Sequence, residues 1–188
     1  MIGVWIIIAI IVVLIIYFIV EYNGLVRQRN NKENAWAQID VQLKRRHDLI
    51  PNLIETVKGY MNHERQTLES VTQARTQAVN VTGGSVAEQA KAENALSQTL
   101  RSLFAVSENY PDLKANQNFL ALQEELTSTE NKISFARQFY NDAVMKLNNK
   151  IQMFPSNIVA GIGHFKEGEM FELEAPAERE VPKVSFSS

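Results

Sequence analysis

The chain begins with an unbroken apolar run and then changes to a regular alternation of apolar and polar positions. The run IGVWIIIAIIVVLIIYFIV, from Ile2 to Val20, contains no charged residue. At 1.5 Å per residue it spans about 28 Å as a helix, close to the hydrocarbon thickness of a bilayer. A cleaved signal peptide would show a basic start, a shorter apolar core and small residues at a cleavage site. The pattern therefore predicts an uncleaved membrane-spanning helix.

Behind this run, apolar residues recur at steps of three, four and seven, which is the spacing of one face of a helix. The first stripe comprises Trp36, Ile39, Leu43, Ile50, Leu53, Val57, Met61, Leu68 and Val71. It predicts one helix of about 60 residues that bends at Pro51, because proline lacks the backbone N–H that a helix interior needs. We expect this helix to end at Gly83 and Gly84.

Two further helices are predicted. Ser85 and Glu88 have the spacing of a capping box, so a second helix should begin there and carry its apolar stripe over residues 86–104. Pro111 fits the first turn of a third helix, whose stripe over residues 119–151 ends at the sequence FPSN. Short connections favour antiparallel packing, so the predicted fold is all-α: one transmembrane helix followed by an antiparallel bundle of long helices.

The pattern divides the chain into four segments. Residues 1–21 form the anchor and residues 22–158 the helical bundle. Residues 159–174, with three glycines and no sustained period, are predicted to be a short docking segment in which Phe165 and Phe171 pack on the end of the bundle. Residues 175–188 are predicted to be a flexible tail.

Charge and composition narrow the function. The net charge of −2 gives no general attraction to nucleic acid, so we expect no nucleic-acid partner. Without cysteine there is no disulfide framework and no thiolate nucleophile. No Lys or Arg precedes the apolar run, whereas Arg27, Arg29 and Lys32 follow it, so the positive-inside rule places the body in the cytoplasm. The opposite topology stays open.

Motifs for catalysis or metal binding are incomplete. The sequence HERQT starts like the H-E-x-x-H zinc helix, but Thr67 stands where the second histidine belongs, and His47 and His164 lie elsewhere. The chain has no G-x-S-x-G and no E-x-x-H of a di-iron bundle. We therefore predict no catalytic residue, no metal and no cofactor.

Polar residues close to the apolar stripes are the candidate site. The first group surrounds the predicted bend and comprises Arg45, Arg46, Asp48, Pro51, Asn52 and Glu64. The second lies on the third predicted helix and comprises Glu125, Glu130, Asn131, Arg137 and Asn141. The structural interpretation is a network that supports the bend and fixes helix register. An interaction surface for an anionic lipid headgroup or an acidic partner is the alternative.

The stretches EYNGLVRQRNNKENAWAQIDVQLKRRHDLIPNLIETVKGYMNHERQTLESVTQAR and YPDLKANQNFLALQEELTSTENKISFARQFYNDAVMKLNNKIQMFPSNIVA strongly resemble the bacterial LemA family of membrane-anchored helical proteins. The first signature block contributes Tyr22, Asn23, Arg29, Asn30, Trp36, Asp40, Arg45, Arg46, Asp48, Pro51, Asn52, Lys58, Tyr60 and Glu64. The second contributes Pro111, Lys114, Glu125, Glu130, Asn131, Arg137, Tyr140, Asn141, Pro155 and Asn157.

The resemblance implies a helical body on one N-terminal span, on the cytoplasmic side of the bacterial inner membrane, with no settled enzymatic activity, cofactor or substrate. From the helix lengths and the anchor we expect a non-enzymatic scaffold that self-assembles into homo-oligomers at the bilayer by coiled-coil-like packing. Two alternatives are an adaptor or modulator of a membrane enzyme such as a protease, and an enzyme that uses the acids of the third helix.

Overall fold

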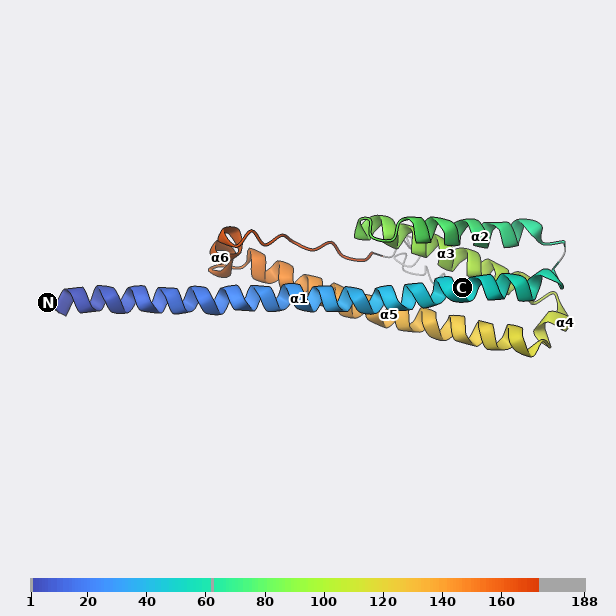
Figure 1. Ribbon diagram of the computed structural model, residues 1–188, viewed down its shortest axis with the longest axis horizontal. Coiled ribbons are helices and arrows are strands. Elements are labelled where there is room, and N and C mark those ends of the chain that lie inside the picture. Colours follow the sequence, from blue (N-terminus) through green and yellow to red (C-terminus); the bar gives the residue numbers. More distant parts are fainter. Residues whose placement is uncertain (1, 62, 173–188) are drawn as a thin grey trace, which may run out of the picture. The chain divides into compact units, whose positions relative to one another are not determined.

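The computed structural model describes residues 2–61 and 63–172, and these residues form helices, turns and extended segments with no strand among them. The helices are α1 (Ile2–Lys58), α2 (Arg65–Asn80), α3 (Val86–Ser107), α4 (Pro111–Lys114), α5 (Gln117–Gln152) and α6 (Ser156–Ile162), as Figure 1 shows. The predicted all-α class is confirmed. The chain divides into two compact units. The first unit holds the described residues of Met1–Leu49 with Leu122–Met170, and the second those of Ile50–Ala121 with Phe171–Ser188.

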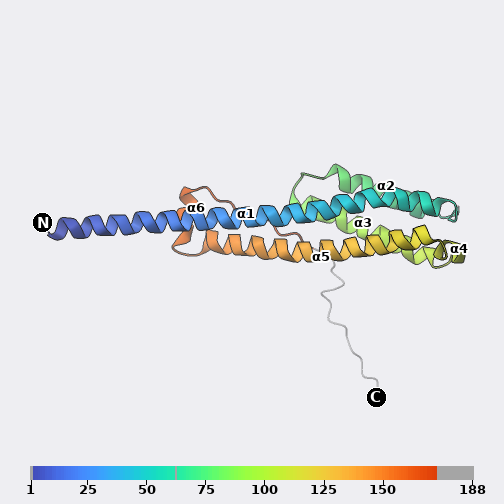
Figure 2. The same cartoon turned by 60° about the horizontal axis from the view of Figure 1, so that its bottom comes forward.

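In the first unit, α1 and α5 lie side by side and run in opposite directions (Figures 1 and 2). As the residue number rises along α1, the number of its α5 partner falls: Glu21 contacts Lys150, and Arg46 contacts Glu130. The predicted stripes supply most of the buried apolar residues. These include Leu25, Ala35, Ile39, Leu43, Leu126, Ile133, Tyr140, Val144 and Leu147.

The second unit contains the last turns of α1, the α2–α3 pair, α4 and the start of α5. Its buried apolar residues include Leu53, Val57, Met61, Leu68, Val71, Leu96, Leu100, Leu103 and Phe119. The capping box at the start of α3 is confirmed: the Ser85 hydroxyl accepts the Glu88 N–H, and the Glu88 carboxylate accepts the Ser85 N–H.

The prediction of one long helix up to Gly83 was wrong. Helix α1 ends at Lys58 and α2 begins at Arg65, with a connection between them. Gly59 follows the last helical residue, and the N–H groups of Tyr60 and Met61 both turn back to the carbonyl of Val57. The apolar stripe keeps its phase across this break, and for this reason the periodicity concealed it. Pro51 lies inside α1, and the helix runs through it.

The third predicted helix also differs in detail. Pro111 opens the single turn of α4, and α5 begins only at Gln117, where the Asn116 side chain accepts the N–H groups of Asn118 and Phe119. After α5 comes helix α6, which the pattern did not predict, so the expected boundary after residue 158 falls inside it. The predicted tail lies outside the described residues.

The N-terminal part of α1 is long and apolar enough to cross a membrane. Its most apolar window of 18 residues has a mean hydropathy of 3.3, and none of that window is buried within the protein. A core helix of a soluble domain would be covered by other elements, so this exposure separates the segment from a core helix.

Candidate functional site

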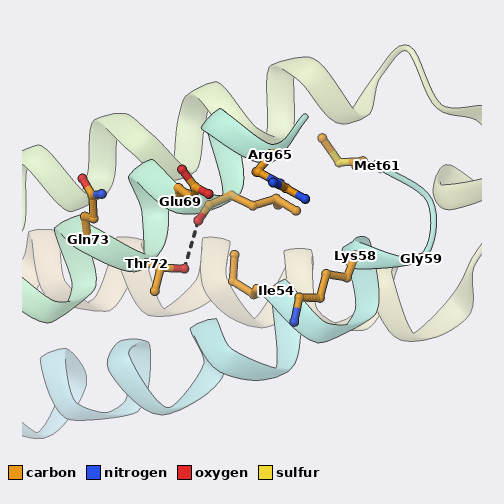
Figure 3. Close-up of a pocket in the computed structure, with 9 residues that line it drawn as sticks. Ile54, Lys58, Gly59, Met61, Arg65, Glu69, Thr72 and Gln73 are labelled. Atoms are coloured by element: carbon orange, nitrogen blue, oxygen red, sulfur yellow. Dashed lines mark hydrogen bonds between the residues drawn. The ribbon is translucent and has the colours of Figure 1, made fainter. Parts of the chain in front are cut away.

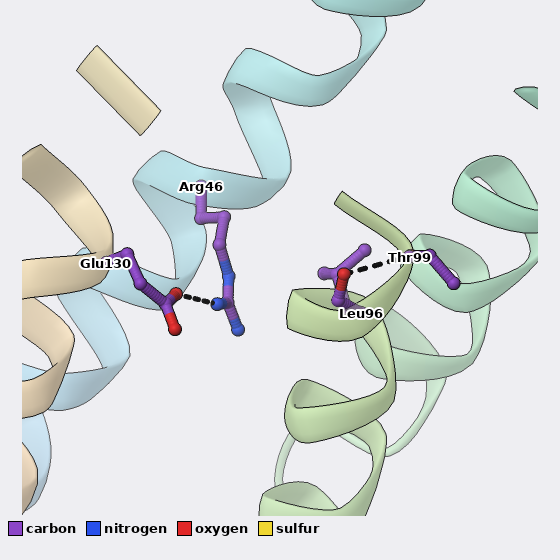
Figure 4. A network of polar contacts seen from close by, with 4 residues as sticks. All are labelled: Arg46, Leu96, Thr99 and Glu130. Carbon is purple, nitrogen blue, oxygen red and sulfur yellow. Dashed lines mark hydrogen bonds and ion pairs between the residues drawn. The ribbon is translucent and has the colours of Figure 1, made fainter. Parts of the chain in front are cut away.

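Two residues of each predicted polar group meet in the first unit, Arg45 and Arg46 on α1 with Glu125 and Glu130 on α5. The guanidinium Nη1 of Arg46 lies 2.5 Å from the Glu130 carboxylate, as Figure 4 shows. The Arg46 side chain is 2% exposed, and that of Glu130 is 32% exposed. A buried guanidinium is stable only where charge partners and hydrogen bonds replace its water. This ion pair therefore fixes α1 and α5 to each other at one position.

A second ion pair joins the same helices close by. Arg45 donates from Nη2 to the Glu125 carboxylate, but both side chains are exposed. Consecutive residues on a helix point about 100° apart, so Arg45 and Arg46 leave α1 in different directions. One arginine binds α5 at the solvent edge while the other binds it in the interior. Together they define a helix register that neither pair would fix as firmly alone.

Tyr140 of α5 is the centre of a further cluster. Its ring lies edge-on to Trp36 of α1, with 5.2 Å between centroids, and is 2% exposed. Its hydroxyl donates to the backbone carbonyl of Glu169 at 2.9 Å. Burial, with a smaller contribution from the Glu169 carboxylate, raises the pKa of Tyr140 to about 12. The phenol therefore stays protonated at physiological pH and acts as a donor.

The segment that follows α6 is fastened along α5 by side chains of α5. The Asn148 amide makes two hydrogen bonds to Gly168, donating to its carbonyl at 3.0 Å and accepting its N–H at 2.8 Å. Gln152 donates to the Glu167 carboxylate at 2.9 Å. With the Tyr140 bond to Glu169, these contacts make residues 166–170 a strap along α5.

An ion pair and an aromatic cluster lie where α1 leaves its apolar run and meets the end of α5. Lys150 lies 3.0 Å from the Glu21 carboxylate, and Gly24 leaves room for it, because a Cβ there would collide with the ammonium group. Phe165, which directly precedes the strap, packs edge-on against Tyr22 with centroids 5.6 Å apart. The Arg29 guanidinium lies 5.7 Å from the Phe165 ring centroid.

An apolar groove runs along the outside of the α1–α5 pair. It has a volume of about 600 Å³ and is lined by Ala37, Gln38, Val41, Gln42, Lys132, Phe135, Ala136 and Phe139. Val41, Phe135 and Phe139 are 62%, 71% and 54% exposed. Two phenylalanines one helical turn apart and open to solvent are characteristic of a surface that another molecule covers.

These residues can now be set against known proteins. The sequence pattern of the LemA family matches residues 35–186, which is most of the chain. The chain belongs to the LemA family. This match begins after the apolar segment of α1 and covers all the side chains of the two ion pairs.

Several curated proteins resemble this LemA-family chain along most of its length. Protein LemA of Metamycoplasma hominis is 30% identical over 148 residues, which cover 78% of this chain and 67% of that protein. Magnetosome protein MamQ 2 of Paramagnetospirillum magneticum is 25% identical, over 89% of this chain and 70% of its own length. Magnetosome protein MamQ of Magnetospirillum gryphiswaldense is 23% identical, over 85% of this chain and 67% of its own length.

Two further residues of the LemA signature stabilise the second unit. Tyr60 follows the end of α1 and accepts a hydrogen bond at its hydroxyl from Asn116 at 3.0 Å. Glu64 precedes α2 and accepts one from the Tyr110 hydroxyl at 3.1 Å. Burial is the main reason why the pKa of Tyr110 is raised, and the hydrogen bond to Glu64 and its negative charge raise it further. The break between α1 and α2 is thus held by residues of the signature.

A pocket of about 890 Å³ lies in the second unit between the last turns of α1 and the first turns of α2 (Figure 3). It is lined by Ile54, Lys58, Gly59, Met61, Arg65, Leu68, Glu69, Thr72 and Gln73. The Thr72 hydroxyl is already committed to the Leu68 carbonyl at 2.9 Å. The lining is largely apolar and carries two cations, Lys58 and Arg65, against one acid, Glu69, which suits an acidic or amphipathic peptide better than covalent chemistry.

Other LemA signature positions do not join the ion pairs. Asp48 and Asn131 are exposed. Pro51 is exposed within α1, and the carbonyl of Asn52 accepts the Thr56 hydroxyl. Arg137 and Asn141 are half-buried on α5, and each has a polar or charge partner.

The sequence reasoning missed several interacting residues in this LemA-family chain. These are Glu21, Lys150, Asn148 and Gly168. It also missed the burial of Gln89 and Glu93 on α3. A polar residue beside a heptad stripe was the available signal for Asn148, since it follows Leu147 directly. Within residues 2–61 and 63–172, no three His, Cys, Asp or Glu side chains gather as metal ligands would.

Proposed function

We propose that this protein is a non-enzymatic, membrane-anchored helical scaffold that self-assembles at the inner face of the bacterial membrane, with its body in the cytoplasm. The apolar start of α1 supplies the anchor. The basic residues Arg27, Arg29 and Lys32, which follow it, support the cytoplasmic orientation. Some of its relatives are named magnetosome proteins, and these names add no detail to this proposal.

The observation that carries self-assembly is the apolar groove of the α1–α5 pair. Phe135 and Phe139 project from α5 beside Val41 of α1, and all three are more than half exposed. Isolated, each side chain would be ordinary, but three on one face make a continuous apolar surface. We propose a second copy of the same chain as its occupant.

The anchor favours this occupant over a soluble protein. Every copy held by the start of α1 has the same orientation in the same plane, so the same grooves face one another at the same height above the bilayer. Restriction to the membrane also raises the effective concentration of copies, which lowers the affinity that each contact must supply. Closed symmetry then gives a defined oligomer. Because α1 ends at Lys58, its part outside the apolar run is shorter than the predicted helix of about 60 residues, and helix length does not support self-assembly.

The test is the native mass of the full-length protein after gentle extraction, by light scattering and electron microscopy. We expect a symmetric homo-oligomer for the wild type and a smaller particle for the double variant Phe135→Ser, Phe139→Ser. Met145→Ser is the matched control, because Met145 is an exposed apolar residue of α5 that does not line the groove. A monodisperse wild-type monomer contradicts the proposal.

An adaptor for a membrane enzyme is the second candidate, and the pocket between α1 and α2 favours it. Lys58 and Arg65 stand at an apolar pocket of about 890 Å³, which suits an acidic segment of a protein partner. This function requires a second polypeptide at stoichiometric yield in the extracted particle. It also requires the double variant Lys58→Glu, Arg65→Glu to lose that polypeptide.

A further inference from the structure

Helix α6 and the turn before it are unusually apolar for a surface element. Between Lys150 and Lys166 the chain carries no Asp, Glu, Lys or Arg. Within this stretch the exposed apolar side chains are Met153 at 63%, Phe154 at 79%, Ile158 at 55% and Ile162 at 61%. We call residues 153–162 the elbow. The buried face of α6 holds Val159 and Ala160 together with Ser156, whose hydroxyl bonds to the Lys150 carbonyl, and Asn157 is exposed. Both sides of the elbow are therefore mainly apolar.

The buried face of the elbow packs directly on α1. Val159 and Ala160 form a core cluster with Leu25, and Phe18, Ile151 and Phe165 pack against it. Phe18 belongs to the apolar run of α1, whereas Leu25 lies beyond its end. The elbow therefore lies at the level of residues 18–25 of α1, a length of about 10 Å at 1.5 Å per residue. In Figures 1 and 2, α6 lies beside α1 accordingly.

The ion pair of Glu21 with Lys150 marks the boundary of this apolar region on both helices. Glu21 is the first charged residue of the chain, so α1 is uncharged from there back to Ile2. Lys150 is the last charged residue before the elbow. Because α1 and α5 are antiparallel, the uncharged part of each extends from the ion pair in the same direction.

We infer that the elbow is a second membrane-contact site, inserted into the boundary between lipid headgroups and acyl chains next to the point where α1 leaves the bilayer. This inference rests on the proposed membrane anchoring. Interfacial helices bury their apolar face about 5–10 Å into the boundary between headgroups and acyl chains. The continuity of the elbow with the apolar surface of α1 commits it to lipid rather than to a protein partner.

Charged groups around the elbow agree with this position. Lys166 follows the elbow, and Arg29 lies over Phe165 just before the strap, whereas the ammonium group of Lys150 is held by Glu21. Long cationic side chains at the rim of an inserted apolar element reach the phosphates while their stems stay in the apolar layer. The strap contacts of Asn148 and Tyr140 hold the chain against α5 as it leaves the elbow. The elbow is thus fixed at both ends, by α5 and by the strap.

The absence of cysteine from the chain allows a clean test by single labels. We would prepare full-length Phe154→Cys and Ile162→Cys variants, attach a fluorophore, and reconstitute them in vesicles of neutral and anionic phospholipid. Ile11→Cys, in the middle of the apolar run, reports anchoring. Thr127→Cys, an exposed position of α5, reports water. Each sample is quenched by lipids brominated near the carbonyl or the methyl end of the acyl chain, and by aqueous iodide.

The expected result is a different quenching pattern for each region. The elbow labels should be quenched by bromine near the carbonyl end of the acyl chain and only weakly by iodide. The Ile11 label should be quenched by bromine near the methyl end. The Thr127 label should be quenched by iodide alone. If iodide quenches the elbow labels while the Ile11 label remains in lipid, the inference is overturned, but membrane anchoring by α1 is supported. Elbow labels shielded from both quenchers indicate a protein cover and also overturn it. An Ile11 label open to iodide contradicts the anchoring itself.

Discussion

The two units of the molecule differ in the contacts that stabilise each of them internally. In the first unit, residues far apart in the sequence meet through directional polar contacts, such as Arg46 with Glu130, Glu21 with Lys150 and Asn148 with Gly168. The second unit has two such contacts, Tyr60 with Asn116 and Glu64 with Tyr110, but it relies mainly on buried leucines and valines and on local caps such as Ser85. The difference reflects how the relative position of the helices is fixed in each unit.

Two long antiparallel helices with regular apolar stripes can slip by one turn and still cover most of their apolar surface. Polar pairs remove that freedom, because a slip would leave Arg46 buried without the carboxylate of Glu130. In the second unit the short connection between α2 and α3 already limits the register. Apolar packing can then supply the stability without further specification.

The largest effect is expected in the second unit, from Leu103→Ala. Leu103 is completely buried, so its truncation leaves a cavity and lowers the free energy of unfolding by about 3 kcal/mol. Leu120→Ala is the matched control, since Leu120 is 47% exposed, and it should cost less than about 1 kcal/mol. Denaturant unfolding of the full-length protein in mild detergent, followed by circular dichroism, measures both. Equal losses would show that Leu103 is not part of a packed core.

Arg46→Ala should be almost as damaging in the first unit, at about 3 kcal/mol, because Glu130 keeps its charge in a largely covered site. Arg45→Ala provides the comparison, because its ion pair with Glu125 is exposed and worth at most about 1 kcal/mol. The same unfolding assay tests the difference. If both arginines cost the same small amount, the buried pair does not set the register of α1 and α5.

The sequence predicted the apolar positions better than the ends of the helices. All the predicted stripe residues from Ile39 to Val71 are buried. The break after Lys58 was missed because the turn preserved the phase of the stripe, and Gly59 was its only strong sign. Periodicity reports which face is covered, whereas a change of chain direction depends on a few backbone bonds, such as those to the Val57 carbonyl.

The candidate site was predicted as residue types and not as pairs. Arg45, Arg46, Glu125 and Glu130 were all selected from the sequence, and the structure joins them across α1 and α5. Which acid meets which arginine depends on helix register, and a single sequence does not contain it. The contacts of the strap were not foreseen, because residues 166–170 have no period and their hydrogen bonds are made by the backbone.

A moderate effect is expected from Tyr140→Phe, which removes the bond to the Glu169 carbonyl and should cost about 1 kcal/mol near pH 7. The effect depends on pH. The folded-state pKa of about 12 lies above the ordinary value of 10, so the contribution of Tyr140 is complete below pH 10 and is lost between pH 10 and pH 12. Wild type should therefore lose about 2 kcal/mol more than Tyr140→Phe across that range. Parallel pH profiles of the two proteins would rule out a buried, protonated phenol.

The smallest effect concerns the cap that begins α3. Ser85→Ala removes the hydroxyl that accepts the Glu88 N–H and should lower the free energy of unfolding by about 1 kcal/mol. Ser102→Ala in the same helix is the control, because the Ser102 hydroxyl bonds only to the Gln98 carbonyl of its own helix and its loss should be nearly neutral. Because the cap acts within the second unit, hydrogen exchange should increase at the first turns of α3 and stay unchanged along the strap. If exchange rises equally in both units, the two units unfold together. Their different contacts would then determine the helix register of each unit but not a separate stability.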